Sequence, residues 1–179
     1  GYFSVGADVN SGSYGFWRMN LLSIVDASGW SYVLKDIPEA SGDYEGFNFL
    51  GLGVIFLIVC ALPAALTGNT GFLETIRRFP VLLVALAGLV AFAISNNVGF
   101  ASLGYEYYLP YELHVLASVF RSSGRMFWPV FYAIICVVMF FIVRGNSTRT
   151  AMYLLGFALV IQIVDTSAAW KGIRERLMT

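Results

Sequence analysis

Residues 120–143 read FRSSGRMFWPVFYAIICVVMFFIV, and this stretch decides the fold. Arg121 and Arg125 lie four residues apart in a polar Ser-Ser-Gly context, and Trp128, Pro129 and an uncharged apolar run follow at once. An aromatic residue and a proline at the start of an apolar run are typical of a membrane helix that begins at the bilayer interface. The two guanidinium groups would then lie just outside the hydrocarbon, where they can bind an anionic head group or a phosphate. The alternative is that they only anchor the helix end at the interface.

The composition is that of a membrane protein. Of 179 residues, 58% are apolar and 12% are charged, and the mean hydropathy is +0.73, whereas soluble domains carry about 25% charged residues. The formal net charge is zero, and no basic cluster indicates nucleic-acid binding. The two cysteines, Cys60 and Cys136, fall within apolar runs, which indicates buried apolar side chains rather than a disulfide or metal ligands.

The order of polar and apolar segments predicts an all-α transmembrane bundle of about four spanning helices, since about 20 residues cross a bilayer. Residues 1–46 are polar and rich in glycine and aromatic residues, which favours an irregular extracytoplasmic segment with turns and short strands. A second extracytoplasmic loop is expected at 101–126, and residues 170–179 begin a further extracytoplasmic segment. Within 47–169, the spanning helices are expected at 47–67, 80–100, 127–143 and 150–169.

The distribution of charge predicts the orientation of these helices. The linkers 68–79 and 144–149 hold four arginines and one acid, whereas the rest of the chain holds seven Lys and Arg residues and ten acids. The positive-inside rule therefore places the two linkers in the cytoplasm. Residues 1–46, 101–126 and 170–179 then share the outer side of a bacterial inner membrane.

The loop 101–126 contains candidates for acid–base chemistry. Glu106 and Glu112 lie near His114 in the sequence, and a carboxylate beside an imidazole can act as a general base or bind a metal. The chain has one histidine and no H-x-x-H spacing, so a hydrogen-bonded loop histidine is the simpler interpretation. The tyrosines of this loop are typical of an interfacial belt, and they are also the residues on which sugar rings stack.

Two further acidic positions are of interest. In Asp43-Tyr44-Glu45, both carboxylates would lie on one face if the segment were a strand. Asp165 ends the last apolar run, where we expect a helix cap or a water-exposed lip of the membrane.

With these residues in view, the chain resembles a bacterial family of multi-pass membrane proteins of unknown function that is related to the GT-C glycosyltransferases. The resemblance is spread over nearly the whole chain. It is carried by Gly1-Tyr2-Phe3, GFWRMNLLSIVD (15–26), DYEGFNFLGLG (43–53), FRSSGRMFWP (120–129) and Asp165-Thr166-Ser167.

This resemblance implies a transferase that moves a sugar from a polyprenyl-phosphate donor to a cell-surface acceptor on the outer side of the membrane. It implies that the chain is an internal fragment, with the catalytic carboxylate upstream of Gly1, so that the catalytic residues are unknown here. Tyr44, Glu45, Arg121 and Arg125 are the positions that it marks for phosphate or substrate binding, to which Glu112 is added from its place in the loop. No cofactor is certain, and a divalent metal is compatible with the resemblance. The expected partners are membrane lipid and the lipid-linked sugar.

Two other functions remain open. One is a non-enzymatic membrane component, such as a polysaccharide exporter, a flippase subunit or a scaffold. The predicted spans hold few strongly polar residues, which argues against a transport path within them. The other is a membrane acyltransferase, for which His114 is the one candidate base.

Overall fold

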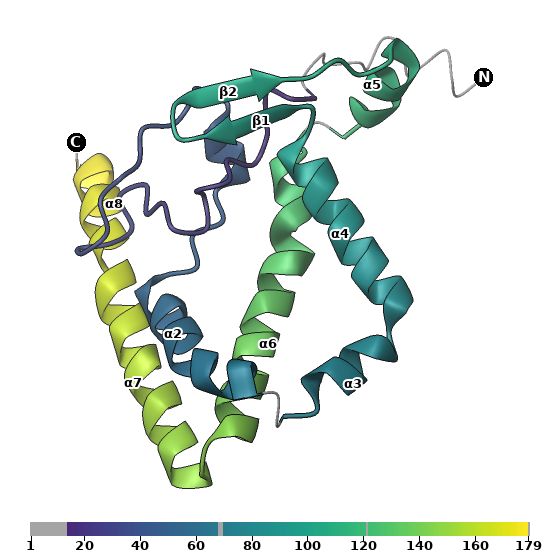
Figure 1. Ribbon diagram of the computed structural model, residues 1–179. Helices are drawn as coiled ribbons and strands as arrows, with labels where there is room; N and C mark the ends of the chain where they lie inside the picture. Colours follow the sequence, from purple (N-terminus) through teal and green to yellow (C-terminus); the bar gives the residue numbers. More distant parts are fainter. Residues whose placement is uncertain (1–13, 68–69, 121, 179) are drawn as a thin grey trace. The chain divides into compact units, whose positions relative to one another are not determined.

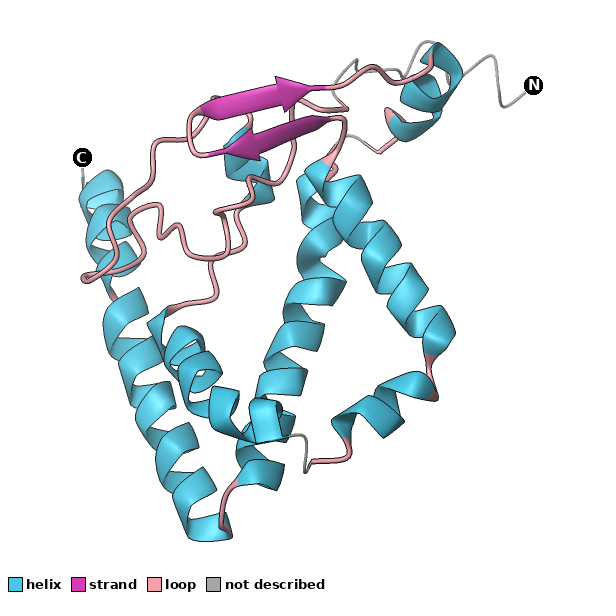
Figure 2. Cartoon of the chain, viewed as in Figure 1, coloured by secondary structure: helices cyan, strands magenta, loops and turns pink. Residues whose placement is uncertain are grey.

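A computed structural model describes residues 14–67, 70–120 and 122–178. Helices predominate, and a two-stranded sheet is the other regular element of the described residues (Figure 2). In chain order the elements are η1 (Asp43–Gly46), α2 (Leu52–Thr67), α3 (Phe72–Arg77), α4 (Pro80–Ile94), β1 (Asn97–Phe100), β2 (Leu103–Glu106), α5 (Tyr111–Ala117), η2 (Gly124–Phe127), α6 (Trp128–Gly145), α7 (Thr148–Thr166) and α8 (Ala168–Met178) (Figure 1). The helical class expected from the sequence is therefore present.

The described residues form two compact units. Unit 1 comprises the described residues within 1–24, 37–48 and 86–129, and unit 2 those within 25–36, 49–85 and 130–179. Each unit is assembled from three separate stretches of the chain, so each depends on contacts between residues that are far apart in the sequence.

Among the described residues, two helices are long and apolar enough to cross a membrane. They span Gly124–Gly145, 22 residues that include η2 and α6, and Thr148–Trp170, 23 residues that include α7. Few residues of their most apolar windows are buried, 28% in the first and 17% in the second. The other two expected spans are shorter apolar helices, α2 with 16 residues and α4 with 15. At 1.5 Å per residue these helices are about 24 and 22 Å long, less than the roughly 30 Å of a bilayer core.

The expected boundaries of α2 and α4 were wrong, for local reasons. The predicted span 47–67 begins at Leu52, because Gly51 has a φ of +83° and the chain before it is not helical. The predicted span 80–100 ends at Ile94, because Ser95 has a φ of +65° and residues Asn97–Phe100 pair in β1. The last expected span, 150–169, lies within the apolar helix Thr148–Trp170, which comprises α7 and the start of α8. The expected outer segment 170–179 is helical through Met178.

Unit 2 is held by close packing of α2 against α7 and α6. Small residues allow the approach, since a Cβ at Gly53 would lie 2.3 Å from the backbone oxygen of Ala158 and one at Gly145 would lie 2.3 Å from the Cβ of Ala64. At the start of α2, Oε1 of Gln162 on α7 accepts a hydrogen bond from the N–H of Gly53, at 3.0 Å. A helix leaves its first N–H groups without intrahelical partners, so this side chain caps α2 from another helix.

Unit 1 is built around an extended segment, residues 17–21. The N–H of Met19 donates to the carbonyl of Ala93 at the end of α4 (2.8 Å), and the N–H of Leu21 donates to the carbonyl of Gly99 in β1 (2.9 Å). The carbonyl of Trp17 accepts from the N–H of Gly124, at the start of η2 (3.0 Å). The antiparallel hairpin β1–β2 adds to one side of this segment through a bridge between Asn20 and Gly99.

Replacing Gly53 with alanine tests the packing of α2 on α7. The added methyl group meets backbone that cannot move away, so we expect a loss of about 1–3 kcal/mol in stability, typical of overpacking, and a lower thermal midpoint in detergent. Gly88→Ala in α4 is the matched control, because no atom lies within 4 Å of its Cβ position. Equal midpoints for the two variants would contradict the packing described here.

Candidate functional site

Two of the site residues predicted from the sequence form an ion pair. The guanidinium of Arg125, in η2, lies against Oε2 of Glu45, in η1. The Arg125 side chain is 55% exposed and that of Glu45 is 16% exposed. The pair therefore leaves much of a cation open to solvent, three residues before α6 begins.

Glycines bring the two short helices together. A Cβ at Gly124 would lie 2.6 Å from the Cα of Gly46, and one at Gly46 would lie 2.3 Å from the carbonyl oxygen of Arg18. A side chain at Gly124 would push η1 and η2 apart, and one at Gly46 would push η1 away from the backbone of Arg18. The distance between Glu45 and Arg125 thus follows from backbone contact, which is more rigid than a contact between two long side chains.

An aromatic surface adjoins the pair. Tyr44 is 58% exposed, and its ring meets the ring of Trp17 edge to face, with 5.2 Å between centroids and 83° between planes. Phe16 packs on Trp17 in the same way, at 4.6 Å and 86°. Edge-to-face contacts of this kind stabilise ring positions beyond simple burial, so Tyr44 is held beside Glu45.

A second ion pair, which is buried, holds η1 in place. Nε of Arg18 donates to Oδ1 of Asp43 at 3.0 Å, and the two side chains are 3% and 1% exposed. The other carboxylate oxygen, Oδ2, accepts from Nδ2 of Asn20 at 2.8 Å and from the N–H of Ala40 at 3.3 Å. Asp43 begins η1, so these bonds fix the helix that carries Tyr44 and Glu45.

The same guanidinium joins η1 to the hairpin. Nη1 of Arg18 donates to the backbone carbonyl of Asn97 at 3.0 Å and contacts its side-chain oxygen as well. Glycine is required where the guanidinium passes β1, since a Cβ at Gly99 would lie 2.8 Å from Nε of Arg18. Arg18 therefore connects three elements of unit 1.

The other predicted site residues are not part of this cluster. Arg121 lies outside the described residues. Glu112 is exposed on α5, separate from η1 and η2. Asp165 is not at a water-exposed lip, because it is 3% exposed. Its Oδ1 accepts from Oγ of Ser31 at 2.8 Å and from the N–H of Tyr32 at 3.0 Å, within unit 2.

Sequence reasoning missed Arg18, and it noted Asp43 only beside Glu45, not as the partner of Arg18. Both lie in stretches that carry the family resemblance, GFWRMN and DYEG. Arg18 is a single charge among apolar and aromatic residues, but the pairing spans 25 residues and no local pattern indicates it.

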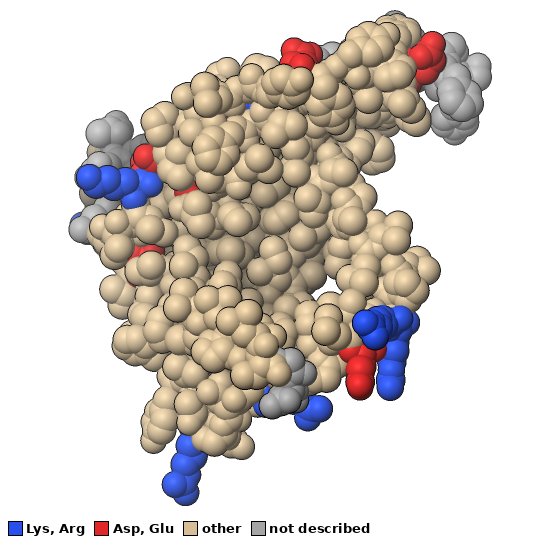
Figure 3. All heavy atoms as spheres, in the orientation of Figure 1, with Lys and Arg blue, Asp and Glu red and all other residues tan. Residues whose placement is uncertain are grey.

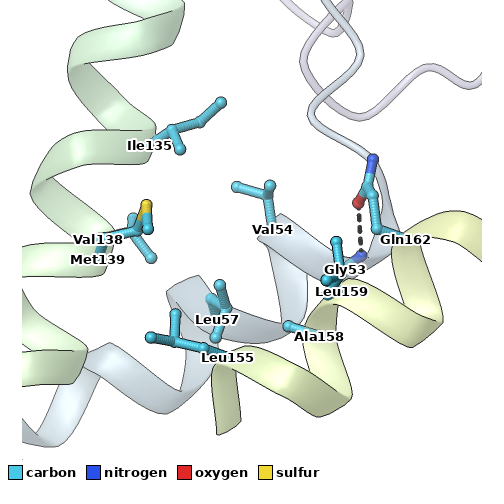
Figure 4. Close-up of a pocket in the computed structure, with 10 residues that line it drawn as sticks. All are labelled: Gly53, Val54, Leu57, Ile135, Val138, Met139, Leu155, Ala158, Leu159 and Gln162. Atoms are coloured by element: carbon cyan, nitrogen blue, oxygen red, sulfur yellow. Dashed lines mark hydrogen bonds between the residues drawn. The ribbon is translucent and has the colours of Figure 1, made fainter. Parts of the chain in front are cut away.

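Unit 2 contains an apolar cavity. It has a volume of about 300 Å³ and lies between α2, α6 and α7, lined by apolar side chains with Gln162 as the polar exception (Figure 4). Such a lining suits an apolar chain rather than a phosphate or a sugar. Among the described residues, no three His, Cys, Asp or Glu side chains gather closely enough to hold a metal ion.

Comparison with known proteins places the chain in a family. Residues 1–167 match the family described as Domain of unknown function (DUF6311). The chain belongs to this family. It is also similar to a probable sulfate transporter of Mycobacterium tuberculosis, with 32% identity over 100 residues that cover 52% of the chain. The chain spans only 17% of the length of that relative. No solved structure matches it.

Removing one partner of the buried pair is expected to unfold unit 1. Arg18→Gln and Asp43→Asn should each lower stability by about 3–5 kcal/mol, because each leaves an uncompensated buried charge. The double variant should lose much less than the sum of the two, since it buries no lone charge. Thermal unfolding in detergent measures all three, and additive losses would show that the two side chains are not coupled.

Proposed function

We propose that this chain is part of an integral membrane protein that transfers a sugar from a polyprenyl-phosphate donor to a cell-surface acceptor, on the outer side of a bacterial inner membrane. The observation that carries the proposal is the half-exposed Arg125, held by Glu45 just before a helix of membrane-spanning length. A lipid phosphate has its charge at the interface and its tail in the hydrocarbon, and a cation at this place suits it.

The surface of the helices supports a membrane location. Large apolar side chains point outward along α4 and α7, among them Val81 (80% exposed), Val84 (74%), Met152 (68%) and Tyr153 (78%). On the face shown in Figure 3, charged atoms are few and most of the visible surface is uncharged. Exposed apolar surface of this extent is unfavourable in water and favourable in lipid.

The chemistry assigned to Arg125 is electrostatic. One of its terminal nitrogens contacts Glu45, and a guanidinium carries five N–H donors, so others remain for phosphate oxygens. When the glycosidic bond breaks, negative charge grows on the leaving phosphate and a fixed guanidinium stabilises it. Arg121, four residues earlier in the sequence, is proposed to contribute a second cation.

Glu45 is assigned a positioning role rather than that of the base. In an inverting displacement, the base stands on the face of the sugar opposite to the leaving phosphate. A carboxylate that contacts the phosphate-binding arginine is on the wrong face for that task. Tyr44 offers a ring face beside the pair, on which the sugar of the donor can stack.

The orientation is part of the proposal. Arg77, Arg78, Arg144 and Arg149 are exposed at or near the ends of α3, α6 and α7, and the positive-inside rule assigns such ends to the cytoplasm. Within unit 1, the end of α4 and the start of η2 bond to the same segment, residues 17–21. This supports our placing residues of the segments 1–46 and 101–126 on the same side of the membrane.

A second candidate is a non-enzymatic transport component. The similarity to a probable sulfate transporter favours it, although that similarity covers 17% of the relative. An exposed arginine would also suit an inorganic anion. The two functions differ in ligand, since a transporter for small anions has no need of a lipid tail.

Binding of a lipid-linked sugar tests the proposal. The protein in detergent should bind a polyprenyl-phosphate-linked hexose saturably, and Arg125→Gln should weaken binding at least tenfold by removing the phosphate contact. Arg125→Lys should lie between the two, because an ammonium cannot bind a phosphate through two parallel bonds. Arg144→Gln, at the other end of α6, is the matched control. Binding of sulfate but not of the lipid-linked sugar would favour the transport function instead.

Cysteine labelling tests the orientation. In a version with Cys60 and Cys136 replaced by alanine, Tyr108→Cys should react with a membrane-impermeant maleimide in intact spheroplasts. Ser147→Cys, in the linker between α6 and α7, should react only after the membrane is permeabilised. The reverse pattern would invert the assigned orientation.

A further inference from the structure

Unit 1 contains a polar cavity that the Arg125 site does not use. Its volume is about 350 Å³, and it is lined by Asn96, Glu106, Tyr107, Tyr108, Leu109 and His114. Small-molecule sites commonly have volumes of roughly 300–1,000 Å³. The structure thus brings together Glu106 and His114, the carboxylate and the imidazole that the sequence placed in one loop.

Part of the wall of this cavity is fixed in place. The N–H of Tyr107 donates to the carbonyl of Asn96 at 2.9 Å, and the Tyr107 hydroxyl donates to the carbonyl of Ser95 at 3.2 Å. Nδ1 of His114 lies 3.4 Å from Oγ of Ser118, and the Tyr14 ring contacts the imidazole edge to face at 6.1 Å. Burial, and then the neighbouring Tyr107, raise the pKa of Tyr14, so this phenol is neutral at physiological pH.

Glu106 and Tyr108 keep unused binding capacity at the cavity. Asn96 is only 4% exposed, and its Oδ1 is closed off from solvent, so this amide oxygen lies behind the wall. The Tyr108 ring is 88% exposed, which leaves a face free for stacking. The Glu106 carboxylate offers an acceptor and the ring an apolar plane, and a ligand that uses both must be amphipathic.

The charge of the lining excludes an anion. Of the six described residues that line the cavity, Glu106 is acidic and none is Lys or Arg. A phosphate or sulfate would therefore meet a carboxylate without a compensating cation. This separates the cavity from the Arg125 site, where the exposed group is a cation.

Two classes of ligand can bind both to a carboxylate and to tyrosine rings. A quaternary ammonium group is attracted to both, but it has no donor or acceptor for the His114 imidazole. A sugar has hydroxyls that donate and accept, and its C–H face is weakly positive against the negative face of a ring. Of the two classes, the sugar can also bond to His114.

We propose that this cavity binds a neutral saccharide, which stacks on Tyr108 and bonds through its hydroxyls to Glu106 and His114. The site is separate from the lipid-phosphate site and does not rest on the proposed transferase activity.

Saturation-transfer NMR on the protein in detergent tests this site, with glucose, galactose, mannose and N-acetylglucosamine as probes at millimolar concentration. At least one should give a saturable signal. Tyr108→Ala and Glu106→Gln should each weaken its binding at least tenfold. Both side chains are exposed, so the thermal midpoint should not change. Tyr105→Ala is the matched control, since Tyr105 is 73% exposed on the same strand as Glu106 but does not line the cavity.

The outcomes separate this inference from the proposed function. Arg125→Gln should keep saccharide binding, and its loss in that variant would overturn the separation of the two sites. The absence of a saturable signal from all four sugars would overturn the proposal. So would equal binding by wild type and the Tyr108→Ala and Glu106→Gln variants, or binding of choline chloride in preference to every sugar.

Discussion

Unit 1 depends on the buried ion pair of Arg18 and Asp43. Removing two charges from water costs several kcal/mol for each ion, and attraction offsets this only when the remaining polar groups are also bonded. Here they are, since Asn20 and Ala40 donate to the carboxylate and Asn97 accepts from the guanidinium. The pair joins η1 to the extended segment and to the hairpin. Such a network specifies one arrangement of these elements more strongly than apolar contact does.

The exposed ion pair of Glu45 and Arg125 differs in physical role from the buried pair of Arg18 and Asp43, which holds η1 in place. A surface ion pair contributes little stability, about 0–1 kcal/mol. Its geometry is nevertheless defined, since Gly46 and Gly124 bring the two backbones into contact. A weak ion pair on a rigid support can open to admit a ligand without loss of the fold. That combination suits a binding site better than a structural one.

The sequence predicted best what depends on local pattern. The span expected at 127–143 corresponds to α6, which runs Trp128–Gly145. A long apolar run that is bounded by an aromatic residue and by arginine is typical of a single long helix. The span expected at 80–100 was too long because Val98, Gly99 and Phe100 continue the apolar run into β1, and Ser95 gives no local sign of a left-handed residue.

For the site residues, too, the sequence predicted only what local motifs indicate. Glu45 and Arg125 were chosen as candidates from motifs, and the structure brings them together, while their role in binding stays a prediction. Arg18 and Asp43 were not chosen, because a buried partner 25 residues away leaves no trace in the residues beside either one. Asp165 was expected to be a helix cap or to lie at a water-exposed lip, and it is buried instead, since Ser31 and Tyr32 come to it from 134 and 133 residues away.

The capping of α2 by Gln162 has a consequence for biosynthesis. Gly53 receives its hydrogen-bond partner from a residue 109 positions later in the chain. Ribosomes add roughly 5–20 residues per second, so the first turn of α2 must wait about 5–20 s for that partner. During this time water can satisfy the free N–H. The bond from Gly53 to Gln162 forms only after α7 has been synthesised, so the start of α2 is completed late in the folding of unit 2.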